Sequence, residues 1–216
     1  MATVTRWSNV QVAIQSSLAT AVTLTGITKA NPGVLSWSTG TDPTNADYIV
    51  LSSQGMYEVD GRVFRVANVN GAGNTAELEG ENTTGYTTFT SGSFQVITFG
   101  TTLSTLTGLQ ASGGDFDFID TTTIHSNVRT QIPGAASPAT YSFESIWDPA
   151  DTGLVALKAA SDSQALRAIR FTFASGAKVV FNGYVGATLL PTGSAGDKVV
   201  TNVTITMFGR PTTYST

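Results

Sequence analysis

The stretch that decides the fold is LRAIRFTFASGAKVVFNGYVGATLLPTGSAGDKVVTNVTITMFGR, residues 166–210. It contains three runs in which apolar and polar residues alternate, separated by turns rich in glycine. Ile169 and Phe171 share one face of the first run, and Val203, Ile205 and Met207 share one face of the last. Alternation with a period of two is typical of a half-buried antiparallel sheet. The stretch therefore predicts three consecutive strands that end at the Gly-Arg-Pro sequence of residues 209–211.

The segment just upstream, WDPADTGLVALKAASDS at residues 147–163, predicts one short helix. Asp148 suits the N-cap, Pro149 suits the first helical position, and Asp151 suits the first turn near the positive end of the helix dipole. The segment also has an apolar stripe that we expect to pack on a sheet, formed by Leu154, Val155 and Leu157.

The composition favours a protein whose surface is covered by other copies of itself. Charged residues make up only 12% of the 216 residues, about half the usual share. An ordinary secreted β-protein with faces rich in serine and threonine is the alternative. The absence of cysteine excludes a disulfide framework, and the net charge of −4 argues against a basic nucleic-acid-binding surface. We expect no signal peptide, no membrane insertion and synthesis in a cytoplasm, because no suitable apolar run occurs.

The charge distribution indicates an inserted unit. Residues 21–93 hold three basic and seven acidic residues, whereas the remainder holds eight of each. The same segment has short alternating runs at residues 21–27, 48–53, 62–69 and 75–79, separated by the turn sequences Asn31-Pro32-Gly33, Asp60-Gly61 and Asn70-Gly71. We therefore predict a core domain of residues 1–20 and 93–216, interrupted by a small β-domain of residues 21–92. The flanks of the insertion are expected to form neighbouring strands of the core.

The order strand, helix and three strands over residues 141–211 resembles the C-terminal half of the major tail tube proteins of lambda-type bacteriophages, which are siphoviruses. The resemblance implies a mainly β fold, a sandwich or rolled sheet with one flanking helix. It implies a structural virion protein without catalytic activity or cofactor. Copies would form rings, six to a ring in the family pattern, that stack by helical assembly into the tail tube. The tube would conduct DNA to the host during genome ejection.

The same resemblance implies a set of partners. The first is the chain itself, and the others are further tail proteins: the tape measure, terminator and distal tail proteins. Phage DNA would pass through the lumen without specific binding, and the protein would be located in the phage tail after assembly in the host cytoplasm. The inserted segment resembles a small β-barrel module of phage structural proteins that is similar to the first catalytic cysteine half-domain of ubiquitin-activating enzymes. Its Asn-Pro-Gly, Asp-Gly-Arg-Val-Phe and Thr-Ser-Gly sequences carry this resemblance.

Residues 110–140, QASGGDFDFIDTTTIHSNVRTQIPGAASPAT, have no clear periodicity and predict a long irregular loop. Within this loop the alternation of aspartate and phenylalanine fits an amphipathic strand with acid on one side and buried aromatics on the other. In lambda-type tail tube proteins the corresponding stretch resembles a loop that reaches between subunits and between rings. The candidate contact residues are therefore Asp115, Phe116, Asp117, Phe118, Asp120, His125 and Arg129.

Motifs for chemistry are weak. His125 is the only histidine, and no Gly-x-Ser-x-Gly sequence accompanies it. Asp115, Asp117 and Asp120 lack the spacing of a calcium loop, because phenylalanine and isoleucine intervene and no glutamate follows. We therefore predict no catalytic, cofactor or metal site. The alternative functions are a tail-fibre or host glycan-binding protein and, less supported, a secreted hydrolase.

Overall fold

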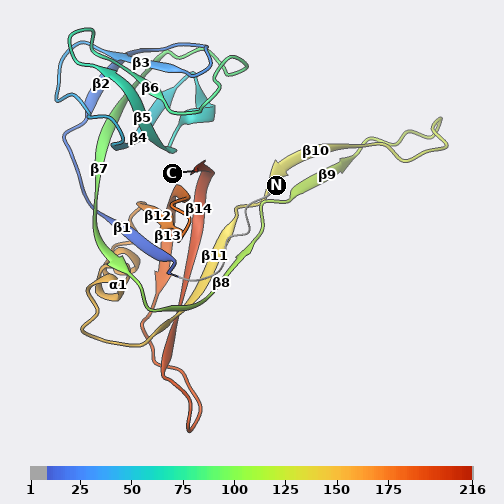
Figure 1. The fold of residues 1–216 in the computed structure, drawn as a ribbon. Helices are drawn as coiled ribbons and strands as arrows, with labels where there is room; N and C mark the ends of the chain where they lie inside the picture. The colour runs from blue at the N-terminus through green and yellow to red at the C-terminus, as the bar shows by residue number, and fades with distance from the viewer. Residues whose placement is uncertain (1–8, 216) are drawn as a thin grey trace.

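The structure, a computed structural model, describes residues 9–215; residues 1–8 and 216 of the predicted core domain lie outside this range. Figure 1 shows a barrel, a second sheet-based body with one helix beside it, and a long two-stranded arm that projects from this body. One sheet of twelve strands runs through barrel and body, and a separate pair of strands forms the arm. The prediction of a mainly β fold with one helix and a small barrel is confirmed.

The barrel has six strands in the order β2–β3–β6–β5–β4–β7, and it closes because β2 also pairs with β7. A short 3-10 helix, η1 (Tyr57–Val59), follows β4. The buried apolar side chains of these strands form one cluster inside the barrel. The strands are β2 (Val22–Ile27), β3 (Val34–Trp37), β4 (Tyr48–Gln54), β5 (Val63–Asn70), β6 (Thr75–Leu78) and β7 (Ser91–Leu103).

The body below the barrel, which we call the core, continues the same sheet. β7 pairs with β1, and the order continues β12–β13–β14–β11–β8. All of these pairings are antiparallel, and one face buries an apolar cluster that α1 covers. The elements are β1 (Gln11–Leu18), β8 (Leu106–Ser112), β11 (Thr140–Ile146), α1 (Thr152–Ser163), β12 (Arg167–Thr172), β13 (Lys178–Ala187) and β14 (Val200–Tyr214).

The three predicted C-terminal strands are present as β12, β13 and β14, and the predicted burial of Val203, Ile205 and Met207 is confirmed. The predicted end of the last strand is wrong. β14 continues past Gly209 and Pro211 to Tyr214, and its last residues pair with the first residues of β13. Pro211 is tolerated there because the ladder has a register shift between Val180 and Asn182, and Pro211 has no partner in it.

The helix begins one turn later than its sequence predicts. Asp151, not Asp148, is the N-cap, and its side chain accepts hydrogen bonds from the backbone N–H groups of Gly153 and Leu154. Asp148 instead closes a turn by accepting from the N–H of Ala150. Leu154 and Leu157 are buried as expected, but Val155 is half exposed. The buried stripe is completed by the small residues Gly153 and Ala160.

Residues 110–140 are not an irregular loop. After β8 ends, β9 (Phe116–Asp120) and β10 (Gln131–Ala136) pair antiparallel and form the arm. Pairing of Ile132 with Ile119 and of Gln131 with Asp120 places the two strands in register. The missing periodicity has a physical reason: within residues 9–215 the arm packs on no other element, so no face is selected for burial.

Barrel and core meet at a junction built around the end of β14. A third apolar cluster joins Tyr48, Val63 and Ile97 of the barrel strands to Ala168, Val180 and Tyr214 of the core. Hydrogen bonds cross it from Thr212 Oγ1 to Val63 O at 2.7 Å and from Asn182 Nδ2 to Gly61 O at 2.7 Å. The C-terminal end of β14 accordingly lies directly beneath the barrel in Figure 1.

Candidate assembly surfaces

Among the described residues, the arm carries the largest group of exposed apolar side chains. Of the fourteen exposed large apolar residues described, six lie on it: Phe116, Phe118, Ile119, Ile124, Val128 and Ile132. Phe118 is 63% exposed and Ile124, near the tip, is 97% exposed. Clusters of exposed apolar side chains mark surfaces that contact another molecule.

Both faces of the arm carry these apolar residues. Ile119 pairs with Ile132, whereas Phe116 and Phe118 alternate with Asp117 along the same strand and so point to the other side. Phe116 and Phe118 share one face of β9, as the alternation predicts, and this face is exposed in the single chain; its burial between copies stays a prediction. A two-stranded ribbon is marginally stable alone in water, so an arm of this kind needs a partner surface.

All seven candidate contact residues from the sequence are brought together on this arm. Asp115 precedes β9, and its backbone carbonyl accepts a hydrogen bond from Ser137 N at 2.8 Å. Asp120 ends β9, and its carboxylate accepts hydrogen bonds from Thr122, which hold the pKa of Asp120 below its ordinary value. His125 and Arg129 lie exposed in the connection between β9 and β10. The role of these residues in contacts between subunits stays a prediction.

The second surface is a free strand edge next to the arm. Within residues 9–215, β8 is the last strand of the sheet and pairs only with β11. Residues 98–103 of β7 likewise pair only with β1, because the pairings with β2 and β4 end at Phe94 and Ile97. The core sheet therefore presents two strand edges with unpaired backbone groups. Such edges readily accept a strand from another chain.

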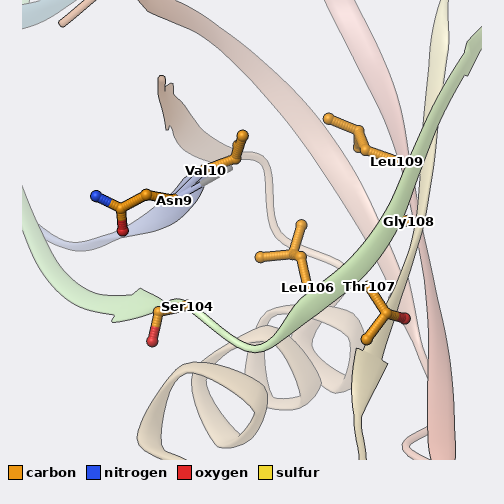
Figure 2. A pocket seen from close by; sticks show the side chains of 7 residues that line it. All are labelled: Asn9, Val10, Ser104, Leu106, Thr107, Gly108 and Leu109. Carbon is orange, nitrogen blue, oxygen red and sulfur yellow. The ribbon is translucent and has the colours of Figure 1, made fainter. Parts of the chain in front are cut away.

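A hollow lies between β8 and the residues that precede β1 (Figure 2). Figure 2 shows the side chains of Val10 and Leu106 pointing into it from the start of β1 and from β8. None of the seven lining residues titrates, so these side chains provide no general acid or base. They are Asn9, Val10, Ser104, Leu106, Thr107, Gly108 and Leu109.

The family model for phage tail tube proteins (TTP) matches residues 54–216, which is more than half of the chain. The chain belongs to the phage tail tube protein family. As a tail tube protein, it is a structural component of the phage tail and thus of the virion. The prediction of this family from residues 141–211 is confirmed, and the match extends from the core sheet into the barrel as far as the end of β4.

Among solved structures, this tail tube protein is similar to the tail of an empty GTA particle, which was computed by helical refinement with C6 symmetry. The two chains are 18% identical, with a TM-score of 0.42, and the similarity covers 53% of this chain and 84% of that chain. A search of curated proteins finds no match.

The tail tube protein has two surface features that its sequence did not reveal. The free edge of β8 depends on the strand order, which alternation alone does not specify. The pairing of β9 with β10, which makes the arm, was also missed. No helix within the described part of the chain is long and apolar enough to cross a membrane. Residues 9–215 contain no cluster of side chains suited to hold a metal ion.

Proposed function

We propose that copies of this tail tube protein close into rings by joining the edges of their core sheets, and that the rings stack into the tube. The observation that carries the proposal is the free edge of β8 beside an arm with apolar residues on both faces. An edge that joins a different edge of the next copy is a heterologous contact, which generates a ring when the rotation closes. We propose six copies, the number that the resemblance to lambda-type tail tube proteins implies.

The proposed tube conducts phage DNA from the capsid to the host cell. The low content of charged residues suits this role, because a sliding polyanion condenses on clustered lysine and arginine and is released slowly from them. The tape measure, terminator and distal tail proteins are the proposed further partners. The role requires no catalysis and no cofactor.

Electron microscopy of the purified full-length protein tests the proposal. We expect rings with sixfold averages and tubes made of such rings. Monomers at all concentrations, or trimeric rods, would contradict ring closure. Trimeric rods would instead support the alternative of a tail-fibre or host glycan-binding protein, which membership of the tail tube family does not favour.

Two neighbouring proline substitutions test the edge itself. Alternate N–H groups of an edge strand point toward its partner and away from it. One of the two variants Gln110→Pro and Ala111→Pro therefore removes a backbone hydrogen bond to β11. The other removes an N–H group that faces the free edge, where a strand of the next copy would pair. Both residues are exposed. The variant whose monomer keeps the wild-type circular dichroism spectrum is expected to lose ring formation. Normal rings from that variant would contradict the role of β8.

A further inference from the structure

We propose that an ion pair selects the edges that join in the ring, with Glu144 at the β8 edge of one copy against Arg170 at the β7 edge of the next. The inference rests on the proposed function, because it concerns the joint between two core sheets. It goes further by naming the second edge, residues 98–103 of β7, and the two side chains that select it. One copy supplies the acid and its neighbour the base, so the joint has a direction around the ring.

Arg170 and Glu144 lie on the same face of the core sheet, the face opposite α1. In β12, Ile169 and Phe171 belong to the cluster that α1 covers, so Arg170 between them points the other way. The same holds for Glu144 in β11, because its neighbour Phe143 belongs to that cluster. Figure 1 shows β7 and β8 on the two outer sides of the core, with β1, β12, β13, β14 and β11 between them. Copies related by rotation about one axis keep this face on the same side of every joint.

Arg170 extends across β1 to the free edge of β7. The residue opposite it in β1 is the small Ala13, whose own partner in β7 is Thr102. The guanidinium carbon of Arg170 lies 4.5 Å from the centre of the Phe99 ring, and Phe99 belongs to the part of β7 that pairs only with β1. The centre of a second ring, that of Tyr48, lies 5.5 Å from the same carbon. Contact with two rings orients the guanidinium before another copy arrives, which lowers the entropy cost of the joint.

The positive charge of Arg170 has no acidic partner in the part of the chain that the structure describes. None of the three ion pairs among residues 9–215 includes Arg170, and its Nε is buried without a hydrogen-bond partner there. Aromatic rings stabilise a partly desolvated cation less than a carboxylate does. A carboxylate from another copy therefore compensates a charge that this chain leaves unpaired.

Glu144 occupies the corresponding position at the other edge. It is the only acidic residue in the seven strands of the core sheet, as these strands are described for residues 9–215. Its partner in β8 is Gly108, and its carboxylate accepts a long hydrogen bond from Thr107 Oγ1 at 3.5 Å, so it is directed toward the free edge. A Cβ atom built on Gly108 would meet nothing within 4 Å. This open space leaves room for the guanidinium of the next copy.

The two edges match in length and in charge. β8 has seven residues, which is close to the length of residues 98–103 of β7. Neighbouring strands lie about 4.8 Å apart, so the two charges come within ion-pair distance when Phe99 lies beside Gly108 of the next copy. Joining two β8 edges would instead bring two Glu144 carboxylates to one joint, and joining two β7 edges would bring two arginines. Opposite charges on neighbouring strands stabilise a pair and like charges destabilise it, so the charges favour a ring over a symmetric dimer.

Two charge reversals test the pair by mixing. Glu144→Arg produces a copy with a base at both edges, and Arg170→Glu produces a copy with an acid at both. Each variant alone is expected to stay monomeric where the wild type forms rings. An equimolar mixture is expected to restore rings in which the two variants alternate, because every edge then meets the opposite charge. Electron microscopy shows the rings, and native mass spectrometry with an affinity tag on one variant counts the copies of each.

The outcomes separate this inference from the proposed function. Normal rings from either variant alone would overturn the ion pair and leave ring closure by sheet edges unaffected. The same conclusion follows if the mixture forms no rings although both variants keep the wild-type circular dichroism spectrum. A wild type that forms no rings would overturn the proposed function and this inference with it.

A second test leaves the half-buried arginine unchanged. Glu144 is exposed, so Glu144→Gln is expected to fold as the wild type does. It should raise the protein concentration at half-maximal ring formation by about 1.4- to 5-fold, the range for one charge pair across two strands. Added salt should reduce this difference. Asp197→Asn removes the same charge from an exposed residue between β13 and β14 and is the matched control, expected to assemble like the wild type. Equal concentrations for Glu144→Gln and Asp197→Asn would overturn the ion pair.

Discussion

Single polar side chains hold the barrel on the core. Thr212, near the end of β14, is buried and donates a hydrogen bond to Val63 O at 2.7 Å. Thr212→Val keeps the shape but leaves that carbonyl without its donor, so we expect a loss of about 1–3 kcal/mol in the free energy of unfolding. Thr213→Val, one residue further and exposed, is the matched control and should change stability by about 0.5 kcal/mol or less. Urea unfolding measures both, and equal stabilities would contradict a role for this bond.

Tyr214 makes the junction sensitive to alkaline pH. Burial raises the pKa of the Tyr214 hydroxyl, which also accepts a hydrogen bond from Arg65 N at 2.7 Å. As pH rises, Tyr214 loses its proton in the unfolded chain first, at about pH 10. The stabilisation that the protonated Tyr214 hydroxyl gives to the folded state is therefore complete below pH 10 and is lost as pH rises through the folded pKa.

Tyr214→Phe tests this directly. Above pH 10 the variant should lose stability less steeply than the wild type, by up to about 1.4 kcal/mol per pH unit. Urea unfolding at several pH values gives the two slopes. At neutral pH the Tyr214 hydroxyl keeps its proton in both the folded and the unfolded state. A constant difference in the free energy of unfolding between wild type and variant at that pH therefore reports only the lost hydrogen bond. If the stability of wild type and variant falls with the same slope above pH 10, the Tyr214 hydroxyl does not cause the loss of stability at alkaline pH.

At the scale of elements, the helix depends on a cap that is easily tested. Asp151 accepts from two backbone N–H groups, at 2.8 and 2.9 Å. Asp151→Ala should reduce the free energy of unfolding by about 1 kcal/mol, whereas Asp151→Asn keeps the acceptor and should cost only a few tenths. Thermal unfolding followed by circular dichroism compares the two. A similar loss in both variants would indicate that the charge of Asp151, and not its capping oxygen, stabilises α1.

The strands that sequence alone could predict are those with one buried face. β12, β13 and β14 alternate because one side packs on the core cluster, and alternation is what a half-buried strand produces. β9 and β10 were missed as a pair because neither of their faces is buried by another described residue of the chain. The N-cap was misplaced because Asp148 and Asp151 both precede a helical pattern, and only the backbone geometry decides between them.

The candidate assembly surfaces also divide into a part that the sequence predicted and a part that it did not. The seven arm residues were predicted from the resemblance of their stretch to the loop that reaches between subunits in lambda-type tail tube proteins, and their role in such contacts stays a prediction. The edge of β8 was not identified, because it is a product of strand order. β8 and β14 lie far apart in sequence, and β8 becomes the last strand of the sheet because β11 pairs with both of them.

The molecule as a whole is built so that the barrel and the core share elements. β7 contributes its first half to the barrel and its second half to the core, and it pairs with β4 and with β1 along the way. The junction cluster buries side chains from both parts. The division into residues 21–92 and the remainder is therefore a proposal about origin, and we expect the two parts to unfold together. An excision of residues 21–92 would expose Val180 and Tyr214, so a weakened core is the expected result.

Leu78 provides the test of this coupling. It is completely buried among the barrel side chains, away from the junction cluster. Leu78→Ala should cost about 2–5 kcal/mol, the usual loss for a core leucine. Trp37 reports on the barrel and Trp147 on the core, and variants that keep only one of the two tryptophans, with Trp7 also replaced, separate the signals. If barrel and core form one cooperative unit, Leu78→Ala lowers the urea midpoint of both probes equally. A shift of the Trp37 transition alone, with Trp147 unchanged, would mean that the core unfolds independently of the barrel and that the junction stabilises neither part.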